Sequence, residues 1–413
     1  MSMRVPLHHR LRPATGRDPG EPHRAATPLE LLYDLTFVIA FGATSSQLAH
    51  GIVEGHTGGA LLAFAFAAFA VSWAWINYAW WASAFDTDDW FVRLMTLVQM
   101  VGVLIMALGI PDVFRSVEHA VLDNGVVVLG YVVIRIGQLA LWLRVAVQDA
   151  AHRRTALAFA TSLLVAQLGW IAVGVAHLPL ATALLLAVPL YLIELTGPVV
   201  AELRLGPTPW HAHHIGERYS LLVIITLGEV VVGTASTVSA TVQEHGWSAD
   251  AALVAFAGTA LAFALWWMYF MMPSGAVLHR HRRRAFVWGY GHIVVFGSLV
   301  AVGAGLDVAA LSSEGEGHLD AAAVAATVAV PAAVLIATFF VLYSLLLLTF
   351  DPFVLVLAIS ALALLAASVA VAATGAPIAA WLGLVVLAPV VVIVGYETIG
   401  HRRQARQLER ILA

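Results

Sequence analysis

A single glutamate in the middle of an apolar stretch carries the most chemical meaning in this sequence. Glu229 lies about a dozen residues into an apolar run that opens near Gly216. A carboxylate at that depth in a membrane helix costs roughly 2.5–3.5 kcal/mol on insertion scales, so it normally faces a partner or a wet cavity rather than lipid. We expect Glu229 to bind a proton or a cation.

Two further carboxylates open the first apolar stretch. Glu30 and Asp34 are four residues apart, on one face of a helix, and two ionised groups at that spacing repel each other. We therefore expect one of them to hold a proton, or a cation or an arginine to lie between them. Thr27, Pro28 and Glu30 also match a capping box, which offers a purely structural role for Glu30.

One arginine lies in the middle of the fourth apolar stretch. Arg135 must find an acid or a carbonyl there. Asp34, Glu194 and Glu229 are the candidate partners. A structural buried ion pair is the alternative to a mobile gate or a substrate ligand.

The start of the seventh apolar stretch carries two more charges. The helix dipole favours Glu217 at that position. Arg218 precedes Glu229 by eleven residues, which returns to within about 20° of the same helix face. This polar face predicts a binding site or a permeation path, with plain helix packing as the alternative. The candidate ion- or substrate-binding residues are Asp34, Glu229, Arg135, Glu30, Glu217, Arg218 and Glu194.

Histidines and aromatic residues add no catalytic pattern. His211, His213 and His214 do not have a zinc-binding spacing, so we expect no metal ligands, no catalytic residues and no cofactor. Two aromatic groups fit an interfacial belt, with a cation–π vestibule as the alternative; they are Trp73, Trp75, Tyr78, Trp80, Trp81 and Trp266, Trp267, Tyr269.

The elements that must position these residues are membrane helices. Apolar residues make up 61% of the 413, and charged residues only 11%, against about 25% charged in soluble domains. Cysteine is absent, which excludes disulfides and thiol chemistry. The apolar runs are long enough to cross the bilayer as helices, and we predict twelve of them: 28–50, 59–82, 93–111, 124–146, 155–176, 180–200, 216–240, 251–272, 285–305, 322–349, 353–374 and 378–399.

The arginines orient these spans. With the N-terminus inside, every arginine except Arg115 and Arg135 falls in an inner loop or a terminus. This asymmetry follows the positive-inside rule. It predicts a multi-pass membrane protein, with the lipid bilayer as its partner and both termini cytoplasmic. The arginines do not form a nucleic-acid surface.

Three matches between the two halves indicate an internal repeat. The segment 75–78 resembles 266–269, Glu30 corresponds to Glu217, and Glu194 corresponds to Glu397. Six spans per half give both halves the same orientation. The fold class we predict is therefore all-α integral membrane, with about twelve transmembrane helices as two six-helix parallel-orientation repeats. The predicted parts are a mobile cytoplasmic arm (1–27), a first repeat (28–200), a cytoplasmic linker (201–215), a second repeat (216–400) and a basic tail (401–413).

Two segments resemble a known family. Residues 27–38 read TPLELLYDLTFV, which is similar to the E-L-F-x-D-L-x-F-V signature of the low temperature requirement A family of bacterial membrane proteins. Residues 214–219, HIGERY, and 224–229, IITLGE, resemble its second signature. Tyr33 and Tyr219 stand where phenylalanine is common. The family is named for a cold-growth phenotype, so the resemblance implies a polytopic protein of the bacterial cytoplasmic (inner) membrane and leaves its activity open.

A transporter or channel for a small ion or solute fits these observations best, and we expect no enzymatic activity. An integral membrane enzyme acting on a lipid or isoprenoid is the first alternative. It requires a lateral opening, and a carboxylate beside His50, His211 or His214. A non-catalytic membrane factor for cold growth is the second, and it requires a packed core around Glu229. A homo-oligomer is compatible with the sequence.

Overall fold

Helices account for the whole regular structure. The computed structural model describes residues 11–21, 24–176, 178–315 and 317–412, and this part of the chain contains no β-strand. Twelve of its helices are long and apolar enough to cross a membrane. The predicted all-α membrane fold with twelve spans is thereby confirmed. The residues group into two compact units, which are described separately.

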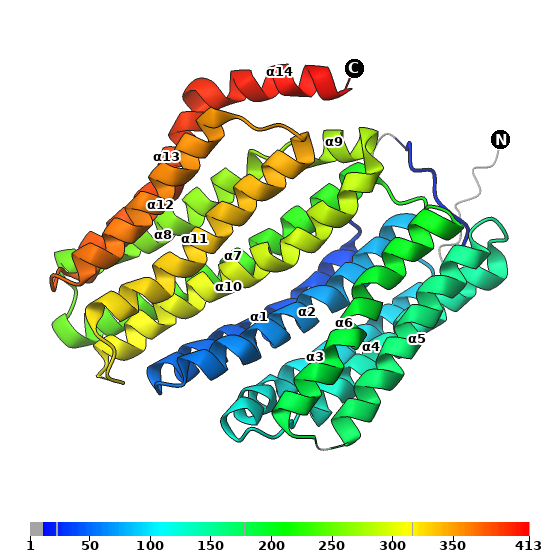
Figure 1. Cartoon of the computed structure of the whole chain (residues 1–413), viewed down its shortest axis with the longest axis horizontal. Helices are drawn as coiled ribbons and strands as arrows, with labels where there is room; N and C mark the ends of the chain where they lie inside the picture. Colours follow the sequence, from blue (N-terminus) through cyan, green and yellow to red (C-terminus); the bar gives the residue numbers. More distant parts are fainter. Residues whose placement is uncertain (1–10, 22–23, 177, 316, 413) are drawn as a thin grey trace, which may run out of the picture. The chain divides into compact units, whose positions relative to one another are not determined.

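Unit 1 comprises Met1–Ala40 and Trp73–Ile215, as far as these are described. It holds the first part of α1 (Pro28–Val53), the second part of α2 (Thr57–Phe85), α3 (Trp90–Glu118), α4 (Gly125–Gln148), α5 (Arg153–Val175), α6 (Leu180–Val200) and the π-turn η1 (Ala201–Leu205). Helices α3 and α4 lie side by side (Figure 1). A Cβ built at Gly102 would lie 2.7 Å from the carbonyl oxygen of Gly130, so glycines permit this close contact.

Within unit 1, part of the N-terminal arm is hydrogen-bonded to residues at the end of α4. Of the predicted mobile arm, residues 1–10 and 22–23 lie outside the described part of the chain. The backbone N–H of Ala14 donates to Gln148 at 2.8 Å, and that of Gly16 donates to Asp149, also at 2.8 Å. Hydrogen bonds from His152 and Gly16 hold the pKa of the Asp149 carboxyl below its usual value, against the opposing effect of burial.

Unit 2 comprises Phe41–Ser72 and Gly216–Ala413, as far as these are described. It contains the remaining parts of α1 and α2. The other elements are α7 (Ala212–His245), whose residues up to Ile215 belong to unit 1, α8 (Ala249–Phe270), α9 (Ser274–Arg280), η2 (Arg282–Arg284), α10 (Ala285–Ser313), α11 (Ala321–Leu347), α12 (Pro352–Ala372), α13 (Ile378–Gly395), η3 (Tyr396–Gly400) and α14 (His401–Leu412). Helix α14 turns away from α13 and runs past α9 (Figure 1).

Helix α10 forms the centre of unit 2. In its most apolar window 78% of the residues are buried, against 17% in α12. Thr237 of α7 donates to the carbonyl of Leu306 at 2.8 Å, and Ser45 of α1 donates to the carbonyl of Val300 at 3.4 Å. Hydroxyl groups thus tie α1 and α7 to α10.

The two units divide the chain differently from the predicted repeats. The predicted linker 201–215 ends where unit 2 resumes, but residues 41–72 group with unit 2 rather than with the first half. The arrangement as two six-helix repeats stays a prediction.

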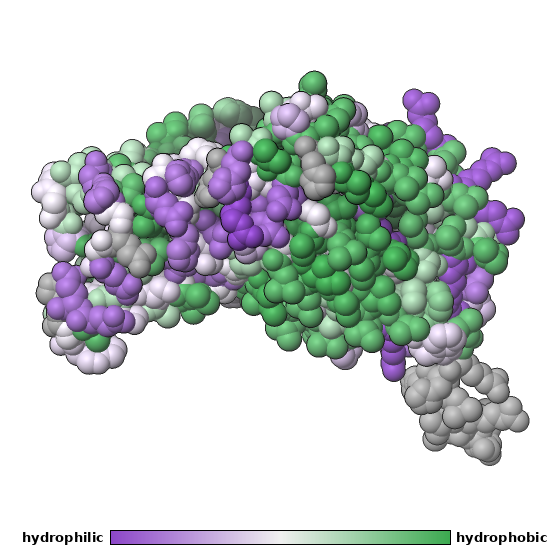
Figure 2. Space-filling view, turned by 90° about the horizontal axis from the view of Figure 1, so that it is seen from below, coloured by the Kyte–Doolittle hydropathy of each residue, from purple (hydrophilic) through white to green (hydrophobic). Residues whose placement is uncertain are grey.

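The molecular surface is largely apolar. Figure 2 shows a broad green expanse on one face, with hydrophilic residues gathered beside it. Many of the large apolar side chains are exposed, such as Leu108, Leu185 and Phe256. Such a surface suits contact with lipid.

Candidate functional site

Glu229 lies in unit 2 among helices that approach it closely. Only 7% of the surface of Glu229 is exposed. A Cβ built at Gly42 of α1 would lie 3.5 Å from the Glu229 Oε1, and one built at Gly303 of α10 would lie 2.6 Å from the Glu229 carbonyl oxygen. Glycine at both positions lets α1 and α10 pack against α7 at this residue.

A second carboxylate is positioned near Glu229. Asp307 of α10 comes one helical turn after Gly303, on the same face of that helix, and Gly303 packs against Glu229. Among the described residues, no arginine or histidine forms an ion pair with Glu229. Ionising two neighbouring carboxylates at once is unfavourable, so a proton or a cation between them would relieve the repulsion.

Unit 1 contains a buried ion pair. The Arg135 Nη2 donates to both oxygens of Glu194, at 2.8 and 2.7 Å, and the Trp73 indole donates to the same carboxylate at 2.6 Å. The Arg135 guanidinium also lies 5.3 Å from the centre of the Tyr131 ring. Of the three acids that the sequence offered to Arg135, Glu194 is the partner. The pair neutralises itself, which favours a structural role.

Asp34 has a different partner. The Trp75 indole donates to its Oδ1 at 2.7 Å, and both residues are buried. The prediction of an interfacial belt is therefore wrong for the whole first aromatic group, and the indoles of Trp73 and Trp75 donate to buried carboxylates. The buried members of this group are Trp73, Trp75, Tyr78, Trp80 and Trp81. The reason is that neighbouring helices of unit 1 surround the second part of α2, where each residue from Trp73 to Phe85 is buried.

Glu30 closes the predicted capping box and also contacts a histidine. Its Oε2 accepts from the backbone N–H of Thr27 at 2.8 Å, and the Thr27 hydroxyl accepts from the backbone N–H of Glu30 at 3.2 Å. The capping box is thus confirmed. The His214 Nε2 lies 3.2 Å from the Glu30 Oε1, and both side chains are fully buried. A histidine–carboxylate contact therefore exists in unit 1.

Two further charged residues, Arg24 before α1 and Asp86 after α2, lie near the C-terminal end of α2. Arg24 donates to the carbonyls of Ser83 and Ala82, both at 2.6 Å, where the C-terminus of α2 attracts positive charge. Burial, followed by the nearby charge of Arg17, lowers the pKa of Arg24. Burial, followed by the charge of Glu30, raises the pKa of Asp86 to about 6.

The remaining two candidates lie in the first turns of α7, where they differ in exposure. Glu217 is exposed, whereas Arg218 is fully buried in unit 2. In the part of the chain that the structure describes, no group of three or more His, Asp or Glu residues could hold a metal ion.

Comparison with known proteins supports the family resemblance of the two signature segments. A family model described as Bacterial low temperature requirement A protein matches residues 25–389, which is most of the chain. The chain belongs to the low temperature requirement A family. An uncharacterized protein from Rhizobium meliloti (strain 1021) is 25% identical over 300 residues, which cover 67% of this chain and 68% of that protein. No solved structure matches significantly.

Sequence reasoning missed Asp307 of this low temperature requirement A protein. The predicted ninth span ended at residue 305, so Asp307 was assigned to an outer loop. Helix α10 continues to Ser313, and Asp307 is half-buried within it. Asp307 follows Gly303, which packs against Glu229, by one helical turn. This spacing would identify Asp307 as a site residue only if the packing of α10 on α7 were known.

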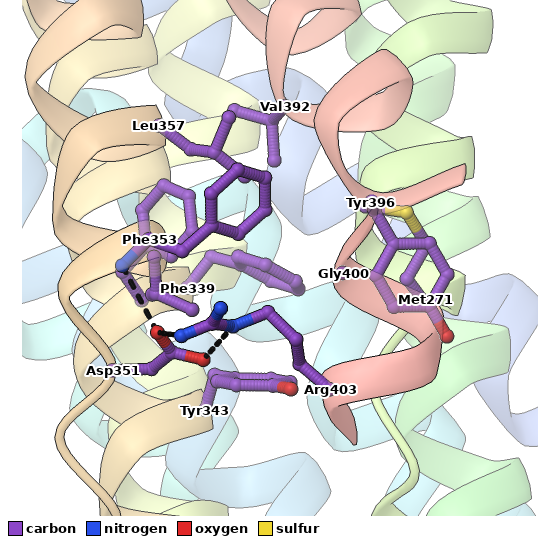
Figure 3. Close-up of a pocket in the computed structure, with 12 residues that line it drawn as sticks. Met271, Phe339, Tyr343, Asp351, Phe353, Leu357, Val392, Tyr396, Gly400 and Arg403 are labelled. Carbon is purple, nitrogen blue, oxygen red and sulfur yellow. Dashed lines mark hydrogen bonds and ion pairs between the residues drawn. The ribbon is translucent and has the colours of Figure 1, made fainter. Parts of the chain in front are cut away.

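Unit 2 of the family member also contains a small recess, of about 30 Å³, near α14. That volume suits about one water molecule. Figure 3 shows Arg403 reaching across it to Asp351, with N···O distances of 2.7 and 2.6 Å. Hydrogen bonding to Arg403 holds the pKa of Asp351 below its usual value. This ion pair anchors α14 and leaves no charge for a ligand.

Proposed function

We propose that this low temperature requirement A protein is a transporter or channel for a small ion or solute, with Glu229 and Asp307 as its proton- or cation-binding groups. The supporting observation is that Glu229 is buried against Gly303 of α10, one helical turn before Asp307, and that among the described residues no arginine or histidine forms an ion pair with Glu229. Intramembrane acids of this kind mark ion pathways and proton relays. The proposal assigns the protein no catalytic step.

The other buried carboxylates of the chain differ from Glu229 in their partners, which supports this assignment. Arg135 compensates Glu194 at hydrogen-bonding distance, and Glu30 caps a helix. Neither arrangement leaves an uncompensated charge that an ion would satisfy. Asp34 accepts an indole hydrogen bond from Trp75, and it stays a candidate binding group beside Glu229 and Asp307.

The proposed setting is the bacterial cytoplasmic membrane, with both termini in the cytoplasm. It rests on the arginines, which gather in alternate loops and at the two ends of the chain. In this orientation the site lies between the midpoint of α7 and its outer end.

Flux through reconstituted protein tests the proposal. The full chain would be placed in liposomes that contain a pH-sensitive dye, and proton, sodium and potassium gradients would be applied in turn. We expect flux above that of protein-free liposomes, and its loss in Glu229→Gln, which keeps the side-chain volume but cannot ionise. The matched control is Glu217→Gln, because Glu217 is an exposed carboxylate on the same helix. Unchanged flux in Glu229→Gln would contradict the assignment of this residue.

A membrane enzyme acting on a lipid is the second candidate function, because His214 and Glu30 form a buried acid–base pair. It predicts a new lipid product, detectable by mass spectrometry, when the protein is incubated with membrane lipids. Loss of that product in His214→Gln would favour the enzyme. Glu30 already serves the cap of α1, so we rank this function below transport.

A further inference from the structure

Unit 2 contains a large apolar groove that the proposed ion site does not use. Four helices line it, namely α1, α2, α10 and α11, and its volume is about 570 Å³. Small-molecule sites usually measure about 300–1,000 Å³. Leu48, Phe64, Ala301 and Pro331 lie on its walls, one from each helix.

The residues that line the groove are almost all apolar. Thr57, Ser298 and Thr327 are the only polar residues among those that line the groove. The Thr327 hydroxyl donates to the carbonyls of Gly305 and Val324, at 3.2 and 2.7 Å. No charged side chain is among the lining residues, so a phosphate headgroup or an ion finds no ligand here.

The surroundings of the groove decide its occupant. All four helices have the length and hydropathy of membrane spans, so the medium around them is the hydrocarbon of lipid. Water needs two to four polar partners to occupy a recess. An empty recess forfeits dispersion contacts along its whole lining. We propose that the groove binds one acyl chain of a membrane phospholipid.

The shape of the groove distinguishes this binding from ordinary contact with surrounding lipid. Gly297 is a buried lining residue of the groove, on helix α10. A Cβ built there would meet Ala68 at 3.7 Å and Phe64 at 4.0 Å, which are ordinary contact distances. An alanine therefore fits at this position, whereas a leucine must extend into the groove. The groove thus depends on the missing side chain at residue 297.

Photolabelling tests the proposal without reference to transport. The full chain would be reconstituted with a phosphatidylcholine that carries a diazirine in its acyl chain, irradiated, digested and mapped by mass spectrometry. We expect the groove-facing peptides of α10 and α11 to be labelled more strongly than the exposed face of α12. Gly297→Leu should reduce that labelling severalfold. Gly383→Leu is the matched control, because a Cβ at Gly383 meets nothing within 4 Å, and it should leave the labelling unchanged.

A second filling variant covers the case in which Gly297→Leu does not fold, as judged by gel filtration. Ala326→Leu narrows the groove from α11 and should reduce labelling in the same way. Equal labelling of the groove and of α12 would overturn the proposal, because it would show only ordinary lipid contact. Labelling that persists in the folded filled variants would overturn it too, as would stronger groove labelling from a headgroup diazirine than from the acyl-chain probe.

Discussion

Removing one partner of the buried ion pair in unit 1 should destabilise the protein strongly. Arg135 and Glu194 are each only 2% exposed as side chains. In Arg135→Met, the Glu194 carboxylate loses both hydrogen bonds from the guanidinium and keeps only the one from Trp73. Breaking a buried pair in this way costs about 3–5 kcal/mol, which is a factor of more than 100 in the unfolding equilibrium because each 1.4 kcal/mol is tenfold.

Removing both charges should restore most of the stability. In Arg135→Met with Glu194→Gln, the new amide oxygen can still accept from Trp73, and no charge stays buried without a partner. We expect the double variant to be at least about 2 kcal/mol more stable than Arg135→Met, since a buried pair can often be replaced without loss. Unfolding of detergent-solubilised protein in SDS, followed by tryptophan fluorescence, would measure these differences.

An exposed ion pair provides the control. Arg93 and Asp88 are paired at 3.0 Å with about half of each side chain exposed, so Arg93→Met should cost no more than about 1 kcal/mol. The reasoning is refuted if Arg135→Met is as stable as Arg93→Met. It is refuted as well if the losses of the two single variants simply add in the double variant, because the groups would then not interact.

Three further substitutions test other parts of the structure. Gly303→Ala should destabilise the packing of α7 on α10 by more than about 1 kcal/mol, since its Cβ would lie 2.6 Å from a backbone carbonyl, whereas Gly383→Ala meets nothing within 4 Å and should be tolerated; thermal unfolding would compare them. Thr27→Ala should cost about 1 kcal/mol through loss of the cap of α1, seen in the same assay. For Asp86, the folded pKa of about 6 lies above its ordinary value of 3.8, so the folded state holds the proton more tightly. Stability should therefore fall by about 3 kcal/mol as pH rises from about 4 to 6, and Asp86→Asn should remove this dependence.

Each of these expectations has a contrary result. Equal melting of the two glycine variants would show that α10 has room to shift at Gly303. A Thr27→Ala protein as stable as the parent would mean that Glu30 alone satisfies the start of α1. Should Asp86→Asn retain the full pH dependence between pH 4 and 6, another group must be responsible for it.

Local patterns in the sequence predicted the membrane helices and one cap. Length and apolar content suffice for a membrane helix because lipid forces the backbone to pair within the segment. The capping box of Thr27 and Glu30 was also predictable, because its hydrogen bonds join residues only three positions apart.

Contacts between helices were not predictable in this way. Arg135 had three candidate acids because the periodicity of one helix does not reveal which helices pack around it. The buried indole donors were misassigned since tryptophan at a helix end suits an interface equally well. Asp307 was missed because an apolar run does not show where its helix stops.

Flux in a double variant of the carboxylate pair tests the central claim most directly. If Glu229 and Asp307 share one proton or cation, either Glu229→Gln or Asp307→Asn alone should abolish ion-driven flux in proteoliposomes. The double variant should then be no worse than either single one, because groups that act as a unit are not additive. Parent-level flux in the double variant, or independent partial losses in the two single variants, would contradict a shared site.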